Sequence, residues 1–507
     1  MKLAFVLLAV ALGASAACPD YSQYSQKPQG TPSSGPLKLP FMRPSAECRT
    51  FNSSAVEKVI ADMNARLKDP DLARLFENTF PNTLDTTVRY FNADQNLAFI
   101  ITGDITAQWL RDTANQFAVY ASLLSTDPEL ATLVRGVINN EARYVAEYPY
   151  CGSFQPPPES GLAPTHNDWA DGVTVNPPVN NQTVFECKYE IDSLCGFLKL
   201  SRGYYDETKD ASFMDDQWYN AIDQIFRVIN EQSQASFDEN FNFISYYNWT
   251  GGNGALSPMV FNRGNGEPKG YTGMVGTHHR PSDDISTYAF LVPANAMLSV
   301  ELANLARILK LSGQSKSSAR GKQIAADAAT WSKRVHDAVW EFSLSDKGNV
   351  FAYEVNGLGA RYEMDDANVP SLVSLPYLGF LDKHNPAYVA TRKKLFSRSN
   401  PYYSAGKTFS GIGGPHVDAW HPWPMSQISA IFGTDDDGEI LERLYLIANN
   451  TAGLGLIHES QSIYDATSYT RPWFAWANSF FAEMLLDLAA RKPGLIFKNN
   501  TPYKPGQ

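Results

Sequence analysis

The sequence predicts a single all-α domain in which two concentric layers of antiparallel helices surround a pocket, with short irregular or β insertions. Apolar side chains recur at helical spacing in about a dozen segments, most of them long. Strand-like alternation is limited to short runs near residues 241–247 and 350–354. With 507 residues, of which 44% are hydrophobic and 19% charged, the chain can bury that many amphipathic faces in one globular body.

The first long helix follows an arm at residues 18–50 that is rich in Pro, Ser and Gly and is expected to be extended. A serine cap near Ser53 and a glutamate within the next turn mark the start of this helix. Pro472 is expected at the first position of the last helix, where its missing N–H costs nothing. Further helices are predicted over residues 109–124, 128–147, 188–202, 216–232, 284–311, 319–342, 386–396, 438–449 and 471–491. The helical domain is therefore expected to span residues 51–495, with a tail at 496–507.

The first 17 residues are typical of a signal peptide. They contain one lysine, an apolar run at residues 3–12 and the small-residue pattern Ala14, Ser15, Ala16. The apolar run is too short to span a bilayer, so we expect a secreted, extracellular protein or one of the secretory pathway or vacuole. Five glycosylation sequons agree with this prediction, at Asn52, Asn181, Asn248, Asn449 and Asn499.

The five cysteines allow at most two disulfides. They are Cys18, Cys48, Cys151, Cys187 and Cys195. A bond between Cys18 and Cys48 would close the arm on itself. The sequence contains no CxxC pair, and no histidine lies between Cys187 and Cys195. The cysteines therefore lack zinc-ligand spacing, and we expect no metal site and no cofactor.

In a helical toroid, the loops at one end converge on a pocket, and the loops richest in polar and aromatic residues are the best candidates for the site. These loops lie at residues 103–112, 166–172, 186–192, 277–284, 416–427 and 458–476. The net charge of −11 and the lack of a basic stripe exclude a nucleic-acid partner, because phosphate binding needs clustered cations. A neutral substrate fits the acidic composition of the chain better than a nucleic acid does.

A carboxylate precedes the aromatic helix at the end of the chain. Glu459 lies between His458 and Ser460, directly after an apolar run, where packing does not explain it. Arg471 and Trp473 follow, and a loop carboxylate beside aromatic rings is typical of a sugar site. The aromatic residues alone are equally well explained as a helix stripe that faces the core.

Two adjacent carboxylates, Asp283 and Asp284, form a second candidate. Either Ser282 or Asp283 is well placed to cap the helix predicted at 284–311. Because one cap needs only one side chain, the second carboxylate indicates proton transfer, with His279 and Arg280 in the same segment.

Three segments are candidates for binding sugar hydroxyls. The motif QWLRDT contains Trp109, Arg111 and Asp112, of which the charged pair can donate to and accept from vicinal hydroxyls. An exposed ion pair is the alternative. Two acidic and aromatic segments add a further set: Asp168, Trp169, Asp171, Glu186, Tyr189, Glu190 and Asp192. Calcium binding is the alternative to this interpretation, but the segments lack the Asp-x-Asp-x-Asp-Gly spacing of an EF-hand loop.

The motifs QWLRDT, YEIDS, HHRPSDD, WPMSQI, HES and TRPWFAWANSFFAE together resemble glycoside hydrolase family 125, the metal-independent exo-α-1,6-mannosidases. The similarity spans about residues 50–490. It implies an (α/α)6 barrel, inverting hydrolysis of terminal α-1,6-linked mannose and a general base at Glu459. It places the general acid in RPSDD, at Asp283 or Asp284.

Inverting glycosidases keep the acid and the base about 6.5–9.5 Å apart, to admit a water. If Asp283 caps the helix, Asp284 is left as the acid. We expect an α-1,6-mannose-containing oligosaccharide or glycan as the partner, no contact with membranes and a monomer. The alternatives are an endo-α-1,6-mannanase, a glucoamylase-like or trehalase-like hydrolase, and a secreted carbohydrate-binding protein without catalysis.

Overall fold

The computed structural model describes residues 18–251, 261–345 and 349–506. The predicted signal peptide lies outside the described residues. Among the helices that are described, none is both long and apolar enough to cross a membrane.

Five helices form an inner layer around the axis of the molecule. They are α5 (Leu110–Ala118), α7 (Ile191–Thr208), α10 (Val292–Leu311), α14 (Pro424–Phe432) and α16 (Ala475–Arg491). Helix α5 packs against both α7 and α16, α7 packs against α10, and α14 packs against α16. A run of turns at residues 371–381 completes the layer near α14, because Tyr377 packs its ring against Phe432 and Phe480. Most inner-layer side chains are buried, so these helices lack a polar face.

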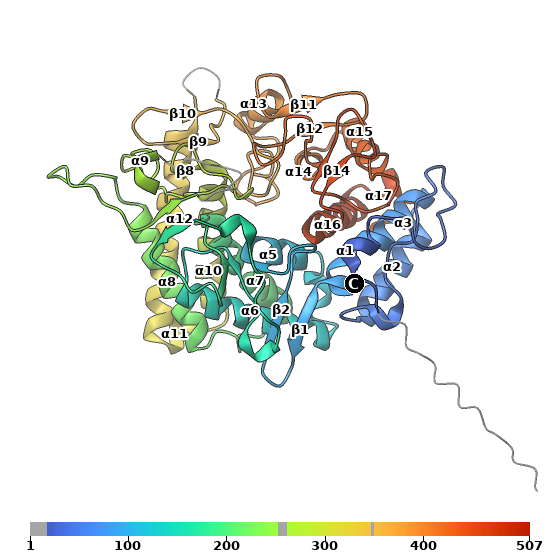
Figure 1. The fold of residues 1–507 in the computed structure, drawn as a ribbon, viewed down its shortest axis with the longest axis horizontal. Helices are drawn as coiled ribbons and strands as arrows, with labels where there is room; N and C mark the ends of the chain where they lie inside the picture. Colours follow the sequence, from blue (N-terminus) through green and yellow to red (C-terminus); the bar gives the residue numbers. More distant parts are fainter. Residues whose placement is uncertain (1–17, 252–260, 346–348, 507) are drawn as a thin grey trace, which may run out of the picture.

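The outer layer covers the inner one. It contains α3 (Pro70–Thr79), α6 (Pro128–Glu147), α8 (Asp216–Gln232), α12 (Ala319–Ser343), α13 (Pro386–Leu395) and α15 (Asp437–Ala448). Helix α6 packs on α7, α12 on α10, α15 on α14 and α3 on α16. The chain runs once around the ring, which brings α2 (Ser54–Arg66) and α3 beside the C-terminal helices (Figure 1). The predicted (α/α)6 barrel is therefore confirmed.

The two layers begin their helices in different ways. A serine, aspartate or asparagine side chain accepts a backbone N–H at the start of each outer helix and of α2; these caps are Ser53, Asp69, Asp127, Asp215, Ser318, Asn385 and Asp436. The five inner helices have no such side-chain hydrogen bond at their N-caps, which are Trp109, Glu190, Leu291, Trp423 and Phe474. Instead, the N-cap residue of each inner helix has an extended backbone conformation.

Three predicted helix starts are therefore wrong. Helix α7 begins at Ile191 rather than at residue 188. Helix α10 begins at Val292 rather than at residue 284, because strand β8 (Phe290–Leu291) precedes it. Neither Ser282 nor Asp283 is its cap. Helix α16 begins at Ala475, so Pro472 lies in the preceding loop and not at the first helical position.

Short antiparallel strands connect the loops before the inner helices. A three-stranded sheet joins β3 (Gln108–Trp109), β4 (Ser153–Phe154) and β6 (Val184–Glu186), and a hairpin pairs β13 (Ser460–Gln461) with β14 (Tyr469–Thr470). The remaining strands are β1 (Val88–Asn92), β2 (Leu97–Ile100), β5 (Thr174–Asn176), β7 (Asn248–Thr250), β9 (Glu354–Val355), β10 (Arg361–Tyr362), β11 (Tyr403–Ala405) and β12 (Ser410–Ile412). The short helices are α1 (Tyr21–Tyr24), α4 (Asn82–Thr86), α9 (Phe261–Gly264), α11 (Gln314–Ser317) and α17 (Pro493–Ile496).

Both ends of the described chain pack on the domain. Cys18 and Cys48 form the disulfide considered above, a second joins Cys151 to Cys187, and Cys195 is free and buried. In the predicted tail, Phe497 is buried and pairs with the backbone of Leu67. The side chains of four sequon asparagines, Asn52, Asn181, Asn449 and Asn499, are exposed, and that of Asn248 is half-buried.

A buried ion pair attaches the arm to the domain. Arg43, 5% exposed, donates from Nε to Oδ2 of Asp85 at 2.7 Å, and Asp85 is 3% exposed. Arg43 also donates from Nη1 to Glu57 at 3.0 Å. Burial raises the pKa of Asp85, which the Arg43 charge opposes. Arg43 of the arm therefore favours the ionised form of the buried Asp85.

We predict that Arg43→Met lowers the free energy of unfolding by about 3 kcal/mol, because Asp85 keeps only Arg49 at 3.7 Å. Urea denaturation measures the loss. The double variant Arg43→Met/Asp85→Leu should recover most of it. Lys58→Met, which breaks an exposed pair with Asp62, is the control and should cost no more than about 1 kcal/mol. Equal losses in the two single variants would contradict the prediction.

Candidate active site

A pocket of about 420 Å³ opens where the loops before the inner helices meet. Its wall includes the first turn of α5, the segment that leads into α7, the turn before α10, and the loops that lead into α14 and α16. Nine of the predicted site residues line it: Trp109, Arg111, Asp112, Trp169, Glu186, His279, Asp283, Glu459 and Arg471. The convergence of loops that the sequence predicted is therefore observed.

Arg111 occupies the centre of a buried acidic cluster. Its guanidinium lies 2.6 Å from Oε2 of Glu190, 3.2 Å from Oδ2 of Asp112, 3.4 Å from Oδ1 of Asp283 and 3.9 Å from Oδ2 of Asp192. One guanidinium cannot neutralise four carboxylates, three of them buried, so protons are retained in the cluster. Burial raises the pKa of Asp112 to about 6 and that of Asp192 to about 7 against the opposing charge of Arg111.

The adjacent carboxylates of Asp283 and Asp284 have separate surroundings. Asp283 has a φ of +68°, in a tight turn in which its N–H donates to the carbonyl oxygen of Arg280 at 2.9 Å. Asp283 lines the pocket and Asp284 does not. Asp284 accepts a hydrogen bond from the Ser282 hydroxyl at 2.9 Å and lies 3.7 Å from Nδ1 of His416.

Burial acts to raise the pKa of Asp283, but the charges of Arg111 and Lys188 outweigh it and hold that pKa well below its ordinary value. In the neighbouring Glu190, burial raises the pKa, and the charge of Asp283 adds to the effect. At neutral pH, Asp283 is therefore the anion of this pair, and Glu190 carries the proton.

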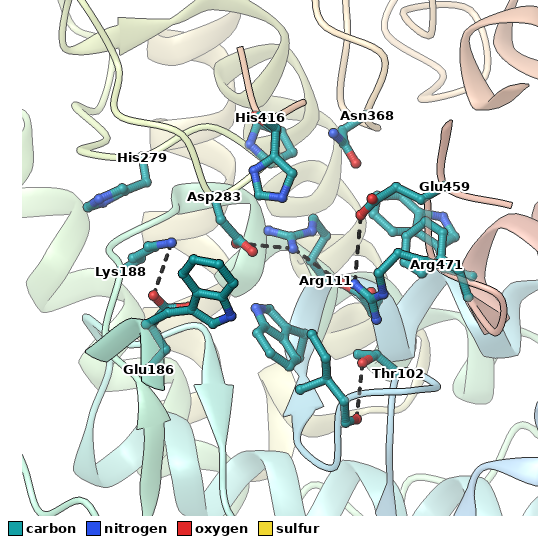
Figure 2. Close-up of a pocket in the computed structure, with 18 of the residues that line it drawn as sticks. Thr102, Arg111, Glu186, Lys188, His279, Asp283, Asn368, His416, Glu459 and Arg471 are labelled. Atoms are coloured by element: carbon teal, nitrogen blue, oxygen red, sulfur yellow. Dashed lines mark hydrogen bonds and ion pairs between the residues drawn. The ribbon is translucent and has the colours of Figure 1, made fainter. Parts of the chain in front are cut away.

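Glu459 lies on the opposite wall. Figure 2 shows Asp283, Lys188 and Glu186 on one side of the pocket, and Glu459 and Arg471 on the other. Oε2 of Glu459 accepts from the Thr470 hydroxyl at 2.8 Å, and Oε1 lies 3.7 Å from Nη1 of Arg471. The β13–β14 hairpin thus orients this carboxylate, since Thr470 belongs to β14.

Nine predicted site residues do not line the pocket: Asp168, Asp171, Tyr189, Glu190, Asp192, Arg280, Asp284, His458 and Trp473. Arg280 is buried against Glu354, 2.6 Å away, and His458 stacks on Tyr469. The ring of Trp473 packs against Tyr21 of the arm and donates to Thr86. Arg280 and Trp473 thus support the wall from behind, with their polar groups bonded to buried partners.

Asp168 lies outside the pocket in an exposed group with His166 and Asp171. One ligand atom of each residue lies within 4.8 Å of the others. The sequence analysis found no metal-ligand spacing here, because the three residues meet only through a short turn, η4 (Asp168–Ala170). Exposed carboxylates often gather in this way without an ion.

The pocket also contains residues that the sequence analysis did not select. Lys188 and His416 occur in loops that it marked as polar, so residue type alone was the available signal. Glu186, which the sequence analysis did name as a hydroxyl-binding candidate, also lines the pocket. Asn368 and Trp249 lie outside those loops, and no local pattern indicates them. His279 packs edge-on against Trp249, and burial keeps its pKa well below the ordinary value, so its imidazole is neutral.

Several buried polar atoms of the wall have no hydrogen-bond partner among the described residues. They are Nε of Arg111, Nε2 of His279 and the indole nitrogens of Trp249, Trp423 and Trp476. Buried polar groups normally have partners, so a ligand rich in donors and acceptors is indicated. A sugar has this chemistry.

His416 is a cation at neutral pH. Burial alone would lower its pKa, but the carboxylates of Asp284, Glu459 and Asp283 together raise the pKa to about 9. Because the folded pKa lies above the ordinary value, the protonated ring stabilises the fold fully below pH ~6.5, and this contribution is lost as the pH rises through about 9.

We predict that His416→Gln removes a pH-dependent part of the free energy of unfolding, on the order of 2 kcal/mol. Urea denaturation of both proteins at several pH values between 6 and 9.5 measures it. The difference between wild type and variant should shrink as the pH rises. A difference that stays constant across this range would contradict the assignment of the charge to His416.

Comparison with known proteins identifies the family. A model of the metal-independent alpha-mannosidases, glycoside hydrolase family 125, matches residues 69–486. The "Meiotically up-regulated gene 157 protein" of Schizosaccharomyces pombe is 45% identical over 492 residues, which cover 95% of each chain. A solved Streptococcus pneumoniae metal-independent alpha-mannosidase, in a non-productive complex with alpha-1,6-mannobiose, is 30% identical, with a TM-score of 0.77 over 86% of this chain and 99% of that one. The chain belongs to glycoside hydrolase family 125 and is an α-mannosidase.

Proposed function

We propose that this mannosidase is a secreted exo-enzyme that releases terminal mannose from α-1,6-linked mannosides or glycans by single displacement, with inversion at the anomeric carbon. The observation that carries the proposal is the placement of Asp283 and Glu459 on opposite walls of one pocket (Figure 2). Two opposed carboxylates can protonate a leaving oxygen and activate a water. The α-1,6 linkage rests on the mannobiose complex of the Streptococcus protein.

Asp283 is the proposed general acid, since it lines the pocket and Asp284 does not. An acid must hold a proton when the substrate is bound. Glu190, whose pKa is raised, retains that proton in the same cluster around Arg111. A bound sugar excludes water from Asp283, which favours transfer of the proton to this carboxylate before the glycosidic bond breaks.

Glu459 is the proposed general base. It takes a proton from a water as the oxygen of that water bonds to the anomeric carbon and the bond to the leaving oxygen breaks. Asp283 gives its proton to the departing oxygen, so the charges balance and the first product is β-mannose. The hydrogen bond from Thr470 fixes one oxygen of Glu459, which leaves the other for the water.

Arg111 and Asp112 are the proposed contacts of the terminal mannose. Both line the pocket in the first turn of α5, and Nε of Arg111 lacks a hydrogen-bond partner among the described residues. An enclosed site of this kind recognises the end of a chain, whereas an endo-acting enzyme needs a groove open at both ends. Secretion is supported by the predicted signal peptide and by the two disulfides. We further propose that the protein acts as a monomer.

We predict that Glu459→Gln lowers kcat by about 10²- to 10⁴-fold and leaves substrate binding largely intact, because the amide keeps the shape but cannot take a proton. Proton NMR of wild-type hydrolysis of α-1,6-mannobiose should show β-mannose first. Glu47→Gln, at an exposed glutamate of the arm, is the matched control and should retain full activity. Initial release of α-mannose would overturn both the role of Glu459 and the single displacement.

We predict that dialysis against a strong chelator leaves the rate unchanged, because two carboxylates perform both proton transfers. The rate on α-1,6-mannobiose before and after dialysis tests this expectation. If activity were lost and then restored by calcium or zinc, the exposed His166, Asp168 and Asp171 group would become the first place to look for the ion.

A further inference from the structure

Arg471 lies between two carboxylates and is shared unequally by them. Its Nε donates to Oδ1 of Asp104 at 2.6 Å, and its Nη2 lies 2.5 Å from the same oxygen. Its Nη1 is 3.7 Å from Oε1 of Glu459 (Figure 2). The contacts with Asp104 are as short as charge-assisted hydrogen bonds, whereas the contact with Glu459 is too long for one. Arg471 is therefore bonded to a carboxylate that does not line the pocket rather than to the one that does.

The backbone fixes this arrangement. Arg471 has a φ of +56°, in the left-handed region that side chains with a Cβ seldom adopt. The Asp104 N–H donates to the carbonyl oxygen of Trp473 at 3.1 Å. A Cβ on Gly103, whose φ is +142°, would lie 2.1 Å from that carbonyl oxygen, so only glycine allows the two loops to approach this closely. The pair thus lies at a tight junction between two segments that are 367 residues apart in the chain.

Other charges also face Arg471 and Glu459. Burial would lower the pKa of Arg471, but the carboxylates of Asp104, Glu459 and Asp112 raise it. His416 is the second cation that interacts with Glu459. Because Asp104 makes the shortest contacts with Arg471, it determines how much of the Arg471 charge reaches the pocket.

The two oxygens of Glu459 have different surroundings. Oε2 accepts the hydrogen bond from Thr470, so Oε1 is the oxygen available to a water, and Oε1 is also the oxygen that faces Arg471. A guanidinium bonded directly to Oε1 would occupy the place of that water. It would also stabilise the anionic form of Glu459 and so make this carboxylate a weaker base.

We propose that Asp104 is a positioning residue for the reaction: it holds Arg471 away from Glu459 and keeps Oε1 free to take the proton of the attacking water. The inference rests on the proposed function, in which Glu459 is the general base. It adds to that mechanism a carboxylate outside the pocket, which acts only through Arg471.

The test is the variant Asp104→Asn, which keeps the side-chain shape and removes the charge. Arg471 then moves onto Glu459, so kcat on α-1,6-mannobiose should fall about tenfold, and the acidic limb of the kcat–pH profile should move to lower pH by about one unit. KM should change less than kcat, because the contacts proposed for the terminal mannose remain. Asp94→Asn, at an exposed aspartate in the turn between β1 and β2, is the matched control and should change neither quantity.

A second variant separates the role of Asp104 from a general disturbance of the loop. Arg471→Met removes the cation, so the acidic limb should move to higher pH, opposite to the shift in Asp104→Asn. In the Arg471→Met background, adding Asp104→Asn should no longer lower kcat tenfold, because the two residues act as one unit.

The outcomes separate this inference from the proposed function. A fall in kcat without a shift of the acidic limb, a shift to higher pH, or wild-type kinetics in Asp104→Asn would each overturn the role of Asp104 alone. Full activity in Glu459→Gln would overturn the proposed function. A limb at lower pH in Asp104→Asn, with Asp94→Asn matching the wild type, supports the inference.

Discussion

The buried guanidinium of Arg111 is the interaction on which the pocket depends. It is 5% exposed and contacts carboxylates from its own helix, from the start of α7 and from the turn before α10. Buried charges are tolerated only when they are paired, and removing one partner is costly. A single cation therefore ties three separate segments into one geometry, and any change in their relative position would leave a buried carboxylate unpaired.

The same cation separates the two chemical roles. Burial raises the pKa values of Glu190, Asp112 and Asp192, neighbouring carboxylates add to the effect, and the cluster around Arg111 therefore retains protons. Across the pocket, Glu459 lies outside this group, with Thr470 and Arg471 as its neighbours. In the proposed mechanism, the side that supplies a proton and the side that accepts one thus differ in the balance of charge, not in the type of residue.

How much of the fold could be predicted depended on the layer. The outer helices α6 and α8 have the predicted bounds, and the observed bounds of α12, α13 and α15 differ from the predicted ones by at most one residue at either end. These helices were predictable because aspartate, asparagine or serine caps mark their starts and amphipathic spacing marks their buried faces. The inner helices lack side-chain caps and a polar face. The predicted starts of α7, α10 and α16 were three to eight residues too early, and α14 was missed, because an apolar segment that follows extended backbone has no local signal at its boundary. The start of α5 differed by one residue. Among the outer helices, α3 was not predicted, although Asp69 caps it.

The site was predictable by residue type but not by orientation. Asp283 and Asp284 are equivalent in sequence, and only the left-handed turn at Asp283 decides which one faces the pocket. Trp169 and Trp473 were equally good candidates for a sugar contact, but Trp473 packs against Tyr21, far away in the chain. Because Arg471 lies just before Trp473 in the same loop, the contact between Trp473 and Tyr21 also stabilises the position of Arg471. Because the family match starts at residue 69, the arm supports one wall of the pocket from outside the matched region.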